Sequence, residues 1–190
     1  MSLHFYPINE DIQKEKSIND FQDIFVQYTY RIPSLKEALT QMFLSTCISD
    51  QKAYELTEDI IKKSEKIVKF NFDLIKEKYS MLTEEDAKII SSYNCETEDS
   101  NYSPYKILNN NLCQEDREKG IKNISKYLYI FLKSLRKLNR YYPKQKYMYR
   151  CINKKVYLKE NYFNKKIIPY SKGNTKIFYG FTSITSGSYF

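Results

Sequence analysis

The sequence predicts an α+β fold, because helical periodicity and strand-like alternation occupy different parts of the chain. Apolar residues recur at helical spacing through roughly the first 140 residues. Pro143 ends this pattern, and the segments after it alternate or are rich in β-branched and aromatic residues. Helices first and strands second is the order typical of an α+β architecture.

Capping signals and apolar stripes predict the helices of the first half. Ser34, with Glu37 three residues later, forms the capping box of a helix whose stripe is Leu35, Ala38, Leu39, Met42 and Phe43. A longer helix is expected at Gln51–Tyr79. Its expected inward residues are Tyr54, Ile60, Ile61, Ile67, Val68, Leu74 and Ile75. Thr83 is expected to cap the next helix, with apolar positions at Ala87, Ile89 and Ile90.

Two further helices are expected before Pro143. Cys95–Pro104 is polar and is expected to form a loop. Tyr105, Leu108 and Leu112 then mark a short helix. Gly120 precedes a strong helix. Its apolar positions are Ile121, Ile124, Leu128, Phe131, Leu132, Leu135 and Leu138.

Three strands are expected after Pro143. Lys146–Ile152 alternates, so that Tyr147, Tyr149 and Cys151 share one face. Ile167–Tyr170 and Ile177–Thr185 are also strand-like, and the turn-forming segment Ser171–Thr175 separates them.

Composition excludes several classes of protein. The chain has only 4 Gly and neither of the glycine-rich phosphate-binding motifs. The four cysteines form no C-x-x-C pair and His4 is the only histidine, so we expect reduced thiols and no metal site. No apolar run approaches the roughly 20 residues of a membrane span, and the N-terminus lacks the pattern of a cleaved signal peptide. We expect a cytoplasmic protein or one delivered into a host cell.

Charge is distributed unevenly. Residues 1–100 carry 12 Lys and Arg against 19 Asp and Glu, a net of −7, whereas residues 101–190 carry 19 against 4, a net of +15. A basic half suits an anionic cofactor or nucleic acid, or it rests against the acidic half. The aromatic and basic segment Arg140–Arg150 is the kind that binds single-stranded nucleic acid. The Lys/Asn/Ile/Tyr bias of the whole chain explains it as well, so nucleic-acid binding is disfavoured.

Short segments from Met81 onward follow a distinctive order. Leu82–Tyr93 is a predicted helix ending in tyrosine, Tyr105–Leu112 contains tyrosine, then asparagine, then leucine, and Leu128–Leu138 leads toward a strand. The later segments are Tyr149-Arg150, then Tyr170 and Gly173, then Phe181-Thr-Ser-Ile-Thr185. Each alone is a weak signal. Together they make residues 81–190 resemble the arginine–serine–glutamate class of ADP-ribosyltransferases, which includes bacterial toxins and eukaryotic ectoenzymes.

The resemblance implies a mixed-β NAD-binding fold and a transferase that moves ADP-ribose from NAD to a protein side chain, with arginine as a reasonable acceptor. It implies that Arg150 contacts the phosphate and ribose side of NAD and that the Cys151 backbone pairs with the nicotinamide carboxamide. Ser183 is the implied catalytic-site serine, which holds the nicotinamide ribose region and the catalytic glutamate. Thr185 retains a hydroxyl where the family has its last serine.

Three departures from the family pattern stand out. Cys151 replaces a frequent glycine, and Ile184 replaces the middle threonine. The family's glutamate motif follows its serine motif, but no acid follows Glu160 in this sequence. We therefore expect a catalytic domain truncated before its glutamate, with little activity of its own. Glu160 is not expected to substitute for that glutamate.

Two other functions stay open. One is a non-catalytic remnant of the transferase that binds protein or nucleic acid, and the other is NAD hydrolysis without a protein acceptor. A Glu-x-Glu or Gln-x-Glu encoded after Phe190 supports the enzyme, whereas a stop codon there supports the remnant. Residues 1–80 are expected to form two or three helices that cover the basic half or bind a partner.

Overall fold

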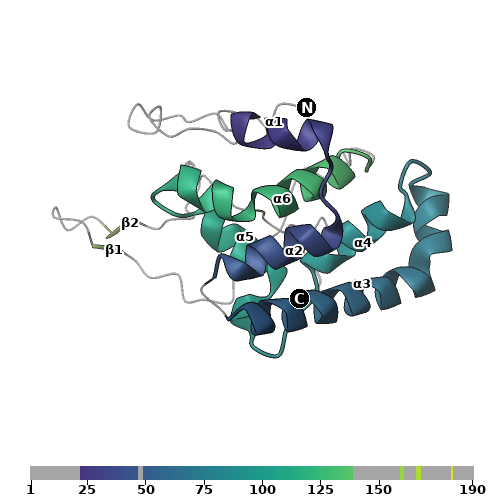
Figure 1. Cartoon of the computed structure of the whole chain (residues 1–190), viewed down its shortest axis with the longest axis horizontal. Coiled ribbons are helices and arrows are strands. Elements are labelled where there is room, and N and C mark those ends of the chain that lie inside the picture. The colour runs from purple at the N-terminus through teal and green to yellow at the C-terminus, as the bar shows by residue number, and fades with distance from the viewer. Residues whose placement is uncertain (1–21, 47–48, 139–158, 161–165, 168–180, 182–190) are drawn as a thin grey trace. The chain divides into compact units, whose positions relative to one another are not determined.

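A computed structural model of the chain describes residues 22–46, 49–138, 159–160, 166–167 and 181 (Figure 1). Six helices make up the larger part. They are α1 (Gln22–Tyr30), α2 (Leu35–Leu44), α3 (Asp50–Lys78), α4 (Glu84–Tyr93), α5 (Pro104–Leu112) and α6 (Arg117–Leu135). A short 3₁₀ helix, η3 (Ser100–Tyr102), precedes α5. β1 (Lys159–Glu160) pairs antiparallel with β2 (Lys166–Ile167).

The chain separates into two compact units, and each is described by itself. All six helices belong to the unit that contains Glu15–Arg140, whereas β1 and β2 belong to the unit that contains Tyr141–Phe190. In β1–β2, Lys159 lies opposite Ile167 and Glu160 opposite Lys166.

The predicted α+β fold class is wrong. Helices dominate the residues that the structure describes, and strand pairing within them is limited to the two-residue segments β1 and β2. A helix forms its backbone hydrogen bonds within itself. A segment with alternating apolar residues forms a strand only when a partner strand supplies those bonds. Glu160 lies in β1. The predicted strands Lys146–Ile152 and Ile177–Thr185 lie outside the described residues except for Phe181, and so does Ile167–Tyr170 except for Ile167.

The core of the helical unit is built around α2 and α6. α2 packs against both α6 and α3, and α6 also contacts α1, α4 and α5 (Figure 1). Ala38, Leu39, Met42 and Phe43 of α2 have no exposed surface. The fully buried residues of α6 are Ile121, Ile124, Tyr127 and Leu128. Burial of each large apolar side chain contributes about 1.5–3 kcal/mol before entropy is counted.

Both predicted N-caps are confirmed. Ser34 accepts from the backbone N–H of Glu37, whose carboxylate accepts from the backbone N–H of Ser34 at 2.9 Å. Thr83 and Asp86 form the same reciprocal pair at the start of α4. Because such boxes use only residues within one turn, the sequence alone specifies them.

The long helix α3 is confirmed at its predicted position, but its inward face is only partly as expected. Ile60 and Val68 are buried, whereas Tyr54, Ile67 and Leu74 are exposed. The buried stripe is Ala53, Leu56, Thr57, Ile60, Ser64 and Val68. Half of these positions are occupied by small or hydroxyl-bearing side chains. A prediction based only on large apolar residues therefore assigns the buried face of α3 incorrectly.

α6 begins earlier than expected. Asp116 is its N-cap, and Gly120 lies inside its first turns rather than before them. The helix ends at Leu135, so Leu138 of the predicted stripe lies beyond it. At Gly120, α6 lies close to the backbone of Asn111 near the end of α5.

Candidate functional site

The residues expected to bind NAD, Arg150, Cys151, Ser183 and Thr185, lie outside the described residues. The structure does describe the three helical segments that precede them in the resemblance. Those segments correspond to α4, α5 and α6. The candidate site therefore consists of side chains from these three helices.

Side chains from the three helices meet in one group, which we call the tyrosine cluster: Tyr93, Tyr105, Asn109 and Phe131. The ring of Tyr93 stacks on Phe131, with centroids 4.9 Å apart, and meets Tyr105 edge-on at 6.3 Å. Asn109 Nδ2 donates a hydrogen bond to Tyr93 OH at 3.3 Å. Burial raises the pKa of Tyr93 and outweighs the opposing hydrogen bond from Asn109, so the phenol is neutral at physiological pH.

A second set of hydroxyls lies in the helical core. Tyr127 OH and Ser92 Oγ share a hydrogen bond of 2.8 Å, and Tyr28 OH shares one of 2.8 Å with Ser125 Oγ. Burial raises the pKa of Tyr127 far above its ordinary value. These hydroxyls all have hydrogen-bond partners, so we assign them a structural role.

An ionic anchor ties the end of α6 to the start of α4. Lys137 Nζ donates to Asp86 Oδ2 at 2.6 Å, and Ser134 Oγ donates to Asp86 Oδ1 at 2.9 Å. Thr83 adds its backbone N–H and hydroxyl to the same carboxylate. The anchor holds the end of α6 against the start of α4. In the sequence, this end of α6 precedes the segment that contains Arg150.

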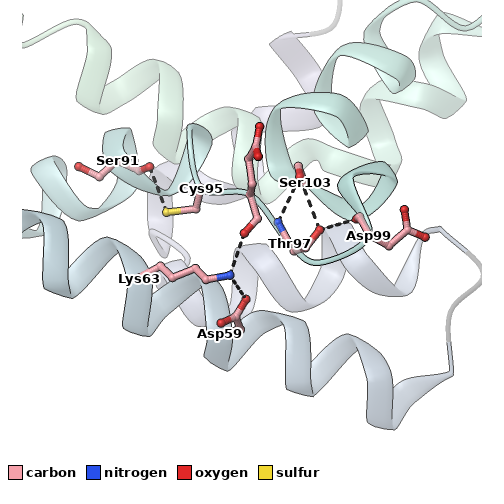
Figure 2. Close-up of polar contacts among 8 residues, drawn as sticks. Asp59, Lys63, Ser91, Cys95, Thr97, Asp99 and Ser103 are labelled. Carbon is pink, nitrogen blue, oxygen red and sulfur yellow. Dashed lines mark hydrogen bonds and ion pairs between the residues drawn. The ribbon is translucent and has the colours of Figure 1, made fainter.

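The loop between α4 and α5 is held by short polar contacts (Figure 2). Lys63 reaches from α3 and donates to Asp59 Oδ2 at 2.6 Å and to the backbone carbonyl of Glu96 at 2.8 Å. Thr97 donates its backbone N–H to Ser103 Oγ and its hydroxyl to the Asp99 carbonyl. Lys63 therefore has a structural role, which is to hold this loop in place.

Cys95 lies at the beginning of this loop, with Sγ 3.5 Å from the backbone carbonyl of Ser91 (Figure 2). Burial raises the pKa of its thiol, and the nearby Lys63 opposes this only in part. Cys113 is exposed. The thiolate is the reactive form of cysteine, so Cys95 is unsuited to act as a nucleophile.

We expect iodoacetamide to alkylate Cys95 at least about tenfold more slowly than Cys113 in the folded protein at pH 7.5, because burial limits both ionisation and access. Peptide mass spectrometry over a time course measures the two rates. Unfolding in guanidinium is the control and should make the rates similar. Equal rates in the folded protein contradict the buried position of Cys95.

The described residues contain no group of three or more His, Cys, Asp or Glu arranged to hold a metal ion. Among the described helices, none has both the length and the apolar character needed to cross a membrane. Comparisons with models of protein families, with curated proteins and with solved structures find no match for this chain.

Sequence reasoning placed the three helices but missed the contacts between them. The tyrosine cluster joins residues separated by up to 38 positions, from Tyr93 to Phe131. One signal for these contacts was present in the sequence. Ser92 follows Ile89 by three positions and Ser134 follows Phe131 by three, so each serine lies on the apolar stripe of its helix. Polar residues at stripe positions indicate buried hydrogen bonds between helices.

Proposed function

We propose that this protein transfers ADP-ribose from NAD to a protein side chain and releases nicotinamide. The observation that best supports the proposal is the tyrosine cluster. Tyr93 and Tyr105 come from two segments that resemble family motifs, and Phe131 comes from the third. Their contact in one cluster is what is expected if the three segments form a unit that precedes the Arg150 motif.

The balance of charge also supports an anionic co-substrate. Residues 101–190 carry a net of +15, and the pyrophosphate of NAD carries two negative charges. A guanidinium can donate two parallel hydrogen bonds to a phosphate, which makes arginine well suited to this contact. In the proposal, Arg150 has this role, while Ser183 and Thr185 hydroxyls hold the nicotinamide ribose region.

The proposed reaction breaks the bond between C1′ of the ribose and the nicotinamide nitrogen. The bonding electron pair leaves with nicotinamide, which becomes neutral. A nitrogen of the acceptor, with arginine as the proposed acceptor residue, forms the new bond to C1′ and loses a proton to solvent. Cationic character develops at C1′, and a nearby carboxylate lowers the barrier.

No Asp or Glu follows Glu160 in this sequence. We therefore expect these 190 residues to bind NAD but to cleave it slowly. Loss of one well-placed stabilising group typically lowers the rate about 100- to 1,000-fold. Liquid chromatography of released nicotinamide measures this rate, and rapid cleavage contradicts the assignment of the carboxylate to a position after Ser183.

The matched pair Arg150→Ala and Arg140→Ala tests the proposed NAD contact, because each removes one positive charge from the same basic segment. We expect Arg150→Ala to weaken NAD binding about 10- to 100-fold, the cost of losing one or two charge-assisted hydrogen bonds. Arg140→Ala should bind within about threefold of the unchanged protein, because a single charge that is not part of the proposed contact contributes little. Titration calorimetry measures both. Equal weakening contradicts the role of Arg150.

A non-catalytic protein-binding module is the second candidate function, and one observation favours it. Ile67, Phe70 and Leu74 of α3 are spaced at helical intervals and are exposed, as is Met81 beyond the helix. Exposed apolar stripes are typical of surfaces that bind other proteins. The same NAD titration separates the two functions, because the binding module is expected to take up no NAD.

A further inference from the structure

A cavity of about 460 Å³ lies between α1 and α6, within the helical unit. Phe25 and Val26 of α1 line one side, and Tyr129, Leu132, Lys133 and Arg136 line the other. This volume is within the range of roughly 300–1,000 Å³ that small-molecule sites occupy. None of the described residues that line the cavity is among those proposed to bind NAD.

One half of the cavity is aromatic and held in place. The rings of Phe25 and Tyr129 are stacked, with centroids 6.3 Å apart and planes at 28°. Tyr28 supports Tyr129 from behind at 5.4 Å, while its own hydroxyl is bonded to Ser125. This half therefore offers a fixed apolar surface to a flat or aliphatic group.

The other half carries two positive charges. Lys133 and Arg136 are three residues apart and so lie on the same face of α6. Within the part of the chain that the structure describes, neither side chain forms an ion pair, whereas Lys122 on the same helix pairs with Glu118 at 2.7 Å. The nearest acid along α1 is Asp23, which does not line the cavity.

We propose that this cavity binds a small anion that carries an apolar body. The anionic group, a carboxylate or a phosphate monoester, lies between Lys133 and Arg136, and the apolar body lies against Phe25 and Tyr129. Two adjacent cations that pair with no carboxylate of the described residues, beside a fixed aromatic surface, match both parts of such a ligand.

Calorimetric titration of the full chain with sodium dodecanoate and with phenyl phosphate tests the proposal and distinguishes the two anionic groups. We expect at least one of them to bind. The double variant Lys133→Gln, Arg136→Gln should weaken that binding about 10- to 100-fold, because it removes the charge-assisted hydrogen bonds to the anionic group, whose contribution is reduced by exposure. Val26→Phe, which fills the cavity from α1, should weaken it as well.

The matched control is Lys119→Gln, Lys122→Gln, which removes the same charge from α6 outside the cavity. It should bind within about twofold of the unchanged protein. Circular dichroism melting confirms that each variant is folded. Absence of binding by both probes, or equal weakening in the two double variants, overturns the proposal.

Discussion

Gly120→Ala is expected to lower the free energy of unfolding by about 3 kcal/mol, although alanine is the better helix former. A Cβ at this position meets the backbone carbonyl oxygen of Asn111 at 2.2 Å and its carbon at 3.1 Å. These are backbone atoms at the end of α5, so relief requires the two helices to separate. Urea denaturation followed by circular dichroism measures the change.

Lys119→Ala is the control, because it places the same alanine at the preceding, exposed position of α6. We expect a change within about 0.5 kcal/mol for this variant. If Gly120→Ala is instead as stable as the control, the close approach of α5 and α6 is wrong.

Asp86→Asn is expected to destabilise the protein by about 2–4 kcal/mol at pH 7. The substitution keeps the shape of the side chain but removes the negative charge to which Lys137, Ser134 and Thr83 donate hydrogen bonds. Breaking one partner of a buried ion pair costs about 3–5 kcal/mol, and the value here is lower because the Lys137 side chain is 31% exposed. Chemical denaturation measures the loss.

The cost of Asp86→Asn is expected to depend on pH. Burial alone raises the pKa of Asp86, but the hydrogen bonds from Lys137, Thr83 and Ser134 outweigh it and leave the pKa lowered. Stability that depends on ionised Asp86 is therefore complete above the unfolded value of about 4 and is lost as pH falls through the lower folded pKa. The difference between the two proteins should shrink below about pH 4.

Glu84→Gln serves as the control for the anchor, since Glu84 pairs with Lys88 on the surface of the same helix. An exposed pair of this kind contributes about 0–1 kcal/mol. A loss for Asp86→Asn no larger than the loss for Glu84→Gln contradicts the anchor between α4 and α6.

Local signals account for the parts of the fold that the sequence predicted. The capping boxes at Ser34 and Thr83 and the stripe of α2 involve contacts within a few residues, so they can be recognised before tertiary structure is known. The span of α3 was predicted for the same reason. Its buried face was predicted only in part, because Ser64 and Thr57 are buried through contacts that the periodicity of apolar residues does not reveal.

The α+β prediction rested on local signals after Pro143, namely alternation and a richness in β-branched and aromatic residues, and such signals do not supply the partner that a strand needs. A segment such as Lys146–Ile152 shows strand-like alternation, but strand formation depends on pairing with residues elsewhere, which one sequence does not specify. The contacts of the candidate site also depend on residues that lie far apart in the sequence. Asn109 and Tyr105 meet Tyr93 only because α5 folds back on α4, and the sequence predicted the helices without predicting that contact.

The NAD assignment can be tested most directly by nuclear magnetic resonance of the isotopically labelled full chain titrated with NAD. We expect saturable shifts of the backbone resonances of Arg150, Cys151, Ser183 and Thr185, with the resonances of α3 unchanged. Arg150→Ala should abolish the shifts at the same NAD concentration. Absence of shifts at millimolar NAD, or shifts confined to α1–α6, contradicts the proposal that these four residues form an NAD site.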